Sequence, residues 1–395
     1  MASKPFRFLH LPAEIREHVY RELLCTANNR QDLGEGNYRY RFDFSLFRAN
    51  RQICYEARKV FRQENVFVRI ETPWAEAAHH IAVEGQVPIL IEGNKADRFE
   101  HHHLAVVIDT TQFQSLDNES RRLVIMADDL PTFCKMWFYS DLSHPFLNGH
   151  LDLLLHIRNP YSTPLEQGSV PKALQQKLLE PFGMVKGLNS VEVQGEHYAS
   201  IEKSMRDAMA VPHTSPEECI ETATKLKDTG NAALAKGNCH EALDLYNRAF
   251  AAIHVVCNGR RRHIWADAFF EKELEGGAYN GKHGQIMRLL LRVRLVANTV
   301  QAYLKLEDYE EARFWGMRSI NLMRQATGAD DEDDEPMLDF VAANEMGKIY
   351  YRTAIACREL DDTSEARKLL RVARLYLPQD QKVQEALASV ALRLG

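Results

Sequence analysis

Three stretches in the second half of the 395-residue chain repeat one pattern, and this limits the folds open to that half. Each has a polar turn, then Glu-Ala, then a helix with apolar spacing: LAKGNCHEALDLYNRA, LKLEDYEEARFWGMRS and CRELDDTSEARKLLRV. Ala242, Ala312 and Ala366 occupy the same place in each unit, where a small residue lets two helices approach closely. One such unit cannot bury its apolar face alone, so neighbouring units stack. The pattern predicts an all-α domain over 215–395.

The first half has a different rhythm, in which short β-rich runs alternate with helical stretches. The predicted strands are 65–70, 104–109, 122–127, 151–157 and 190–195. The predicted helices are 13–24, 47–63, 73–83, 129–139 and 171–182. The segment VPHTSPEE (211–218) supplies prolines and a helix start signal between the two halves. We therefore expect a multidomain chain, with an N-terminal α+β domain over 1–210 and a helical domain after it.

Composition narrows the function classes. Hydrophobic residues make up 45% of the chain, charged residues 26%, and the net charge is −6, which is typical of a soluble globular protein and does not favour nucleic acid as the main partner. No run reaches the roughly 18 apolar residues of a membrane span, and no secretory signal is present. The seven scattered cysteines lack a C-x-x-C spacing. We expect reduced thiols, no membrane partner, and a cytoplasmic or nuclear protein.

The repeated units resemble the tetratricopeptide repeat (TPR), a 34-residue helix-turn-helix unit. The resemblance covers three repeats, 219–253, 290–324 and 343–377, and a last helix at 379–393 would cap the stack. It implies a TPR superhelix whose first helices line a concave inner surface. Two segments interrupt this half: the connection 257–285 and the acidic run within 328–336. Both are predicted to be solvated connections, and Arg260, Arg261 and Arg262 of the first would add positive charge.

Five polar residues recur on the first helices of these repeats. A helix turns by about 100° per residue, and this places all five on one face, opposite the packed side. They are Lys227, Asn231, Asn298, Lys348 and Arg352. Three cations and two carboxamides on one surface suit a doubly anionic group, such as a chain terminus that ends in Asp. The alternative is that each is a solvated residue on a helix surface.

The same five residues look like the dicarboxylate clamp of TPR co-chaperones, in the segments LKDTGN, LVANTVQAYLK and GKIYYRTA. This resemblance implies a ligand: the acidic C-terminal tail, ending Glu-Glu-Val-Asp, of the chaperones Hsp90 or Hsp70. The acidic run 329–335 could also fold back onto the clamp and compete with such a tail.

The N-terminal segment FLHLPAEIREHVYRELL carries an apolar stripe of Ile15, Val19 and Leu23. After a polar loop, 26–44, comes LFRANRQICYEARKVFRQENVFVRI. Together the two segments resemble fungal F-box-like proteins with a Glu-x-Arg motif, here Glu14-Ile15-Arg16. A true F-box binds the Skp1 adaptor of SCF ubiquitin ligases, and the resemblance implies contacts from Leu11, Pro12 and Ile15. The alternative is a helix pair that packs on its own sheet.

No catalytic or metal site is predicted. The sequence has no Walker-type loop, dinucleotide-binding fingerprint or nucleophile elbow. Adjacent histidines in a strand point to opposite faces and rarely bind one ion. We therefore expect no metal at His79-His80 or at the run His101, His102 and His103, which is predicted to be a polar segment before the strand at Leu104.

The leading hypothesis is a non-enzymatic adaptor, or co-chaperone, without a cofactor. Its TPR domain would hold a chaperone tail, and its N-terminal domain would bind an unknown client or a second factor. The second hypothesis is an F-box-type substrate receptor of an SCF ubiquitin ligase that uses Skp1. The third is an enzyme hidden in the α+β half, which a cluster of polar residues buried in a pocket would favour.

Overall fold

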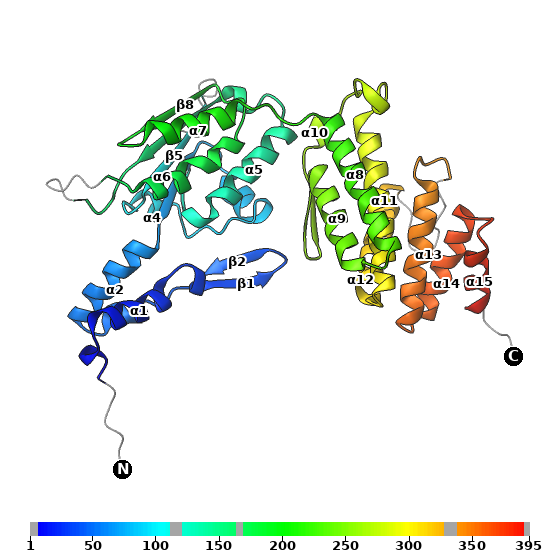
Figure 1. Cartoon of the computed structure of the whole chain (residues 1–395), viewed down its shortest axis with the longest axis horizontal. Coiled ribbons are helices and arrows are strands. Elements are labelled where there is room, and N and C mark those ends of the chain that lie inside the picture. Colours follow the sequence, from blue (N-terminus) through cyan, green and yellow to red (C-terminus); the bar gives the residue numbers. More distant parts are fainter. Residues whose placement is uncertain (1–6, 111–120, 163–168, 328–337, 391–395) are drawn as a thin grey trace, which may run out of the picture. The chain divides into compact units, whose positions relative to one another are not determined.

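The computed structural model describes residues 7–110, 121–162, 169–327 and 338–390. The chain divides into two compact units (Figure 1). The N-terminal unit is Met1–His213 with Asn258–Arg261, and the C-terminal unit is Thr214–Cys257 with Arg262–Gly395. Each unit has its own set of secondary-structure elements, and each is described separately.

A six-stranded mixed sheet forms the centre of the N-terminal unit, in the order β4-β6-β3-β5-β7-β8. Its strands are β3 (Phe67–Thr72), β4 (Ile91–Glu92), β5 (Leu104–Thr110), β6 (Arg121–Met126), β7 (Leu151–Ile157) and β8 (Ser190–Gln194). β3 and β5 are parallel, as are β7 and β8, while the other pairs are antiparallel. The five predicted strands are all present, because their alternating or continuous apolar residues face buried layers.

Helices accompany this sheet (Figure 1). The longer ones are α5 (Leu130–Ser143), α6 (Lys172–Leu179) and α7 (Ala199–Ala210). α5 buries an apolar face that includes Phe133 and Trp137, and the Trp137 indole donates to Asn148 Oδ1 at 2.9 Å. The N-terminal half is thus an α+β unit, as predicted.

The segment 26–44, predicted to be a loop, contains a β-hairpin. β1 (Arg30–Gly34) and β2 (Asn37–Tyr40) pair antiparallel, and Gly34, Glu35 and Gly36 all have positive φ in the turn. Two glycines supply the left-handed backbone that such a tight turn requires. The sequence reading missed the hairpin because its strands are polar and mostly exposed.

Among its described residues, the C-terminal unit contains three antiparallel helix pairs. They are α8 (Pro216–Ala235) with α9 (Cys239–Ala252), α11 (Gly284–Lys305) with α12 (Tyr309–Thr327), and α13 (Ala343–Glu359) with α14 (Thr363–Tyr376). The first helix of the middle pair, α11, packs against both α8 and α13. A further helix, α15 (Gln381–Ser389), packs on α14. The second half is therefore a stack of helix-turn-helix units, as its repeated sequence pattern predicts.

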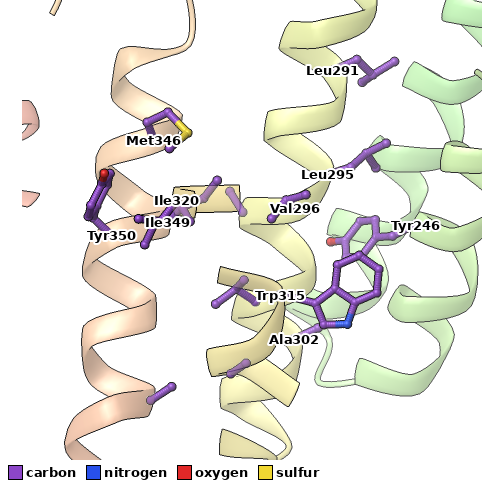
Figure 2. Packing of buried hydrophobic residues seen from close by; sticks show 14 of the residues in the cluster. Tyr246, Leu291, Leu295, Val296, Ala302, Trp315, Ile320, Met346, Ile349 and Tyr350 are labelled. Atoms are coloured by element: carbon purple, nitrogen blue, oxygen red, sulfur yellow. The ribbon is translucent and has the colours of Figure 1, made fainter. Parts of the chain in front are cut away.

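Small residues allow the close packing within this stack. Ala242, Ala312 and Ala366 are all fully buried. A Cβ on Gly316 would lie 1.8 Å from Thr353 Oγ1, so only glycine fits where α12 meets α13. Figure 2 shows the larger core residues between these helices, with Val296 of α11 near Ile320 of α12.

The connection between the first two helix pairs is folded, so the prediction of a solvated loop over 257–285 is wrong. It contributes β9 (Val255–Asn258), β10 (Arg261–Ile264) and α10 (Asp267–Phe270). Trp265, Phe270 and Leu274 are buried in the core of the unit, where burial of apolar surface outweighs the entropy of ordering the chain. The other predicted connection, the acidic run 329–335, lies outside the described residues.

All seven cysteines are free thiols, and Cys134, Cys219, Cys239 and Cys357 are buried. Burial raises the pKa of the Cys219 and Cys357 thiols to about 11, which keeps them protonated and unreactive. Across the described residues, no helix combines the length and the apolar character that crossing a membrane requires.

Candidate functional site

The first helix of the stack carries two of the five predicted site residues. α8 begins with a capping box, in which Ser215 and Glu218 each accept a hydrogen bond from the other's backbone N–H. This start sets the phase of a 20-residue helix. Lys227 and Asn231 then lie one turn apart on the same face of α8.

Asn231 connects the first helix pair to the second. Its Oδ1 accepts from Asn298 Nδ2 of α11 at 2.7 Å and from the Tyr246 hydroxyl of α9 at 2.9 Å. Two donors satisfy a carbonyl oxygen, whereas the Asn231 amide nitrogen has no hydrogen-bond partner among the described residues. Asn231 is therefore oriented as a donor toward anything that binds at this exposed position.

Arg352 of α13 connects the third helix pair to the second. Its Nη1 donates to the carbonyl of Ala297, the residue before Asn298. Burial lowers the Arg352 pKa below its usual range, while the nearby Tyr246 and Tyr351 oppose that shift. Burial also raises the Tyr246 pKa to about 12, and the positive charge of Arg352 works against this. Tyr246 thus donates to Asn231 on one side and is close to the charge of Arg352 on the other.

The two lysines differ in their surroundings. Lys348 is exposed on α13, one turn before Arg352, and forms no ion pair or hydrogen bond with another described residue. Lys227 has a side chain only 13% exposed, and its Nζ lies 2.9 Å from Asp228 Oδ1. No hydrogen bond among the described residues joins either lysine to the group formed by Asn231, Asn298 and Arg352. We call these five residues the polar face of the C-terminal unit.

Tyr246 is the member of this arrangement that the sequence reading missed. It lies on α9, the second helix of its pair, whereas the five predicted residues all lie on first helices. Its ring packs against Gly230, where an added Cβ would come within 2.6 Å of the ring. The glycine immediately before Asn231 is the signal that could have revealed this contact, because it marks a close approach to the helix.

The N-terminal candidate residues lie on an exposed edge. Leu11 is half-buried, Pro12 is exposed, and Ile15 on α1 (Ala13–Leu24) is 50% exposed. The buried face of α1 instead carries Arg16, Tyr20 and Leu24. The predicted stripe of Ile15, Val19 and Leu23 is therefore not the packed face, since Leu23 is also half-exposed.

Arg16 explains the Glu-x-Arg motif in structural terms. Its Nε and Nη2 donate to both carboxylate oxygens of Glu56 on α2 (Arg51–Glu64), at 2.9 and 2.7 Å. The Tyr20 hydroxyl donates to the same carboxylate at 3.0 Å, and Arg16 Nη1 donates to the Leu11 carbonyl. Arg16 above all holds the pKa of Glu56 down to about 2. The arginine joins α1 to α2 and is not available to a partner.

Two residues of the histidine run 101–103 are part of the packed N-terminal unit. His102 and His103 lead into β5 and are buried, and burial lowers their pKa values to about 3 and about 4. They are therefore neutral at physiological pH. In the part of the chain that the structure describes, no group of three or more His, Cys, Asp or Glu side chains is placed to hold a metal ion.

One series of hydrogen bonds in the N-terminal unit is similar to a hydrolase triad. His80 Nε2 lies 2.9 Å from Ser140 Oγ, and His80 Nδ1 lies 2.7 Å from Glu84 Oε2. However, Ser140 lies inside α5 and its hydroxyl donates to the Met136 carbonyl at 3.1 Å. A nucleophilic serine must instead donate to the histidine. The Ser140 hydroxyl has a single hydrogen, so it cannot donate to the Met136 carbonyl and to His80 at the same time.

Solved TPR domains are among the structures that are similar to this chain. No protein-family model matches the chain. The first TPR domain of human RPAP3 is 18% identical, with a TM-score of 0.27, over 43% of this chain and 91% of that domain. The C-terminal TPR-containing domain of an FK506-binding protein from Plasmodium falciparum is 17% identical, with a TM-score of 0.29, over 45% of this chain and 91% of that domain. The repeat architecture described above rests on this chain's own helix pairs.

Proposed function

We propose that the C-terminal unit is a TPR superhelix that binds the acidic C-terminal tail of Hsp90 or Hsp70, ending Glu-Glu-Val-Asp. The protein would act as an adaptor or co-chaperone without catalytic activity, and its N-terminal domain would bind a client or a second factor. One observation carries the proposal: Asn298 of α11 donates to Asn231 of α8, and Arg352 of α13 donates to the Ala297 carbonyl of α11, so side chains of all three first helices are tied together. Side chains held in this way need little reordering when a ligand binds.

The chemistry of the polar face suits a terminal aspartate. Arg352 and Lys348 supply positive charge from consecutive turns of α13, and charge-assisted hydrogen bonds to carboxylates contribute about 1.5–3 kcal/mol each. The free amide nitrogen of Asn231 offers a neutral donor. Lys227 would exchange its neighbour Asp228 for a ligand carboxylate. Because Lys348 is exposed, its contribution weakens as salt rises.

Calorimetric titration of the full chain with a peptide ending Met-Glu-Glu-Val-Asp tests the proposal. We expect micromolar affinity, about −8 kcal/mol, and loss of binding when the terminal carboxylate is amidated. Lys348→Ala should weaken binding at least tenfold and change the free energy of unfolding by less than about 0.5 kcal/mol, because the side chain is exposed and has no partner among the described residues. It is a cleaner probe than Arg352→Ala, which also removes a contact to Ala297.

Lys225→Ala provides the matched control. Lys225 lies on α8 with its side chain 74% exposed and paired with Glu221, two positions before Lys227. It should bind the peptide as the wild type does. Equal affinity for the acid and the amide, or for wild type and Lys348→Ala, would contradict the proposal.

A second function is favoured by the exposed apolar face of α1. Ile15 and Leu23 are 50% and 49% exposed, which suits a docking surface for another protein such as the Skp1 adaptor. In this alternative the chain is a substrate receptor of an SCF ubiquitin ligase. Co-purification of Skp1 that is lost with Ile15→Asp, and retained with Glu14→Gln, would support it. Absence of Skp1 from the purified wild-type complex would contradict it.

A further inference from the structure

A cavity of about 320 Å³ lies within the C-terminal unit, away from the polar face. α11, α12, β10 and the start of α13 line it, and its apolar wall includes Leu289, Val293, Val296, Leu322, Phe340 and Met346. Val296 and Met346 can be seen on neighbouring helices in Figure 2. Leu289 and Asn298 are nine residues apart on α11, which places them about 180° apart around the helix. The cavity and the polar face therefore use opposite sides of α11.

Two arginines face this otherwise apolar cavity. Arg262 of β10 and Arg292 of α11 both line it, and the Nε of each is buried without a hydrogen-bond partner. Neither guanidinium forms an ion pair or a hydrogen bond with another described residue. The carboxylate of Asp267, which attracts Arg292, is already paired with Arg288 at 2.7 Å. The positive charge in the cavity has no counter-charge there among the described residues.

The arginines also repel one another. Burial is the main cause that lowers the pKa of both Arg262 and Arg292 to about 10, and the charges of Arg292 and Arg318 add to the shift of Arg262. Arg318 lies close by, because its Nη2 donates to the Arg262 carbonyl at 3.0 Å. Like charges held together in an apolar setting destabilise a fold. An anion bound between them would remove that penalty.

The shape and lining of the cavity limit what the anion can be. About 30 Å³ is the share of one water in the liquid, so the cavity has room for on the order of ten non-hydrogen atoms. Most of these atoms would contact apolar side chains, and Met346 can adapt to a range of shapes. A carboxylate occupies less of this space than a phosphate does, and it matches the planar guanidinium of an arginine.

We propose that this cavity binds a small amphipathic carboxylate, with its head group between Arg262 and Arg292 and its apolar body against α11 and α12. The site is separate from the polar face and does not depend on the function proposed for it. It would make the C-terminal unit a receptor for an acyl-type ligand as well as a peptide-binding domain.

Calorimetric titration of the full chain with octanoate tests this proposal, because octanoate has a seven-carbon apolar chain on a single carboxylate. We expect a Kd below about 1 mM, and at least tenfold weaker binding of octanol, which has the same chain without the charge. Arg292→Gln and Arg262→Gln should each weaken octanoate binding at least tenfold. Arg294→Gln is the matched control, since Arg294 lies on α11, is paired with Glu345, and does not line the cavity.

Three results of this titration would contradict the proposal. No octanoate binding by the wild type, equal binding of octanol, or unchanged affinity in a folded Arg292→Gln or Arg262→Gln variant would each do so. Circular dichroism establishes which variant is folded, and the double variant Arg262→Met, Arg292→Met decides if both single variants unfold: unchanged affinity for octanoate there overturns the proposal as well. Binding that appears only after acidic residues 330–335 are changed to Asn and Gln would mean that the chain's own carboxylates occupy the site.

Discussion

Arg16 in the N-terminal unit is buried and Arg292 in the C-terminal unit is half-buried, and the surroundings of the two arginines are opposite. Arg16 donates to both oxygens of Glu56, and Tyr20 donates to the same carboxylate. Arg292 has a buried Nε without a partner and lines an apolar cavity with Arg262. One arginine completes a contact between two helices, and the other is held next to a like charge.

This difference separates structural charges from functional ones. In a buried ion pair, each charge compensates the other. Removing one partner therefore destabilises the fold, because the remaining charge is left buried and unpaired. An unpaired buried charge destabilises the fold unless a ligand supplies the opposite charge. Replacing the arginine by methionine should therefore lower the stability of the fold at Arg16 and raise it at Arg292.

The largest effect is expected at Arg16. Arg16→Met should lower the melting temperature of the N-terminal unit by several degrees, because it removes the positive charge and two hydrogen bonds from the Glu56 carboxylate and the Arg16 donor from the Leu11 carbonyl. Differential scanning calorimetry of the full chain measures it. Arg21→Met on the same helix is the control, since Arg21 is 43% exposed and exposed ion pairs contribute little. Equal shifts in both variants would mean that the buried pair has no special role.

The second largest effect is expected from low pH, which should destabilise the N-terminal unit before the C-terminal unit. The pKa values of His102 and His103 in the folded chain, about 3 and about 4, lie below the 6.5 of an unfolded histidine. Between these values the unfolded chain binds more protons, so the stability of the N-terminal unit is full above about pH 6.5 and falls as pH drops. Hydrogen exchange with mass spectrometry should show this unit opening first below pH 6, and His103→Phe should reduce the loss. Earlier opening of the C-terminal unit would contradict this order.

The smallest effect, and the one of opposite sign, is expected at Arg292. Arg292→Met should raise the free energy of unfolding of the C-terminal unit by about 1 kcal/mol, because an apolar side chain replaces a half-buried guanidinium whose buried Nε has no partner. Chemical denaturation followed by fluorescence of the buried Trp265 and Trp315 reports on this unit. Arg294→Met should instead be neutral or slightly destabilising, since it removes the ion pair with Glu345. A destabilised Arg292→Met would indicate that Arg292 has a structural partner.

The elements of both halves could be predicted where periodicity was strong. The strand at 151–157 and the helix at 13–24 match β7 and α1 residue for residue, because each repeats its apolar pattern over a whole element. Failures occurred where the pattern was weak. The polar hairpin β1–β2 and the folded connection through Trp265 and Phe270 owe their structure to turn glycines and to distant apolar contacts.

The candidate site divides in the same way. The spacing of Lys227 with Asn231, and of Lys348 with Arg352, is a property of a single helix, and it places each pair on one face from sequence alone. The contact between Asn231 and Asn298 joins residues that are 67 positions apart. The hydrogen bond from Tyr246 to Asn231 depends on how α9 packs against Gly230. Such contacts are not encoded in any local period.

What the sequence determined by itself was therefore the strongly periodic elements, the repeat, and the helix face that each pair of polar residues shares. Only the tertiary structure decided which charges are paired: Arg16 meets Glu56 across 40 positions, whereas Arg262 and Arg292 meet a cavity. The physical reason is that helical and strand periods follow from backbone geometry within a few residues. The environment of a charge depends on every element that packs around it.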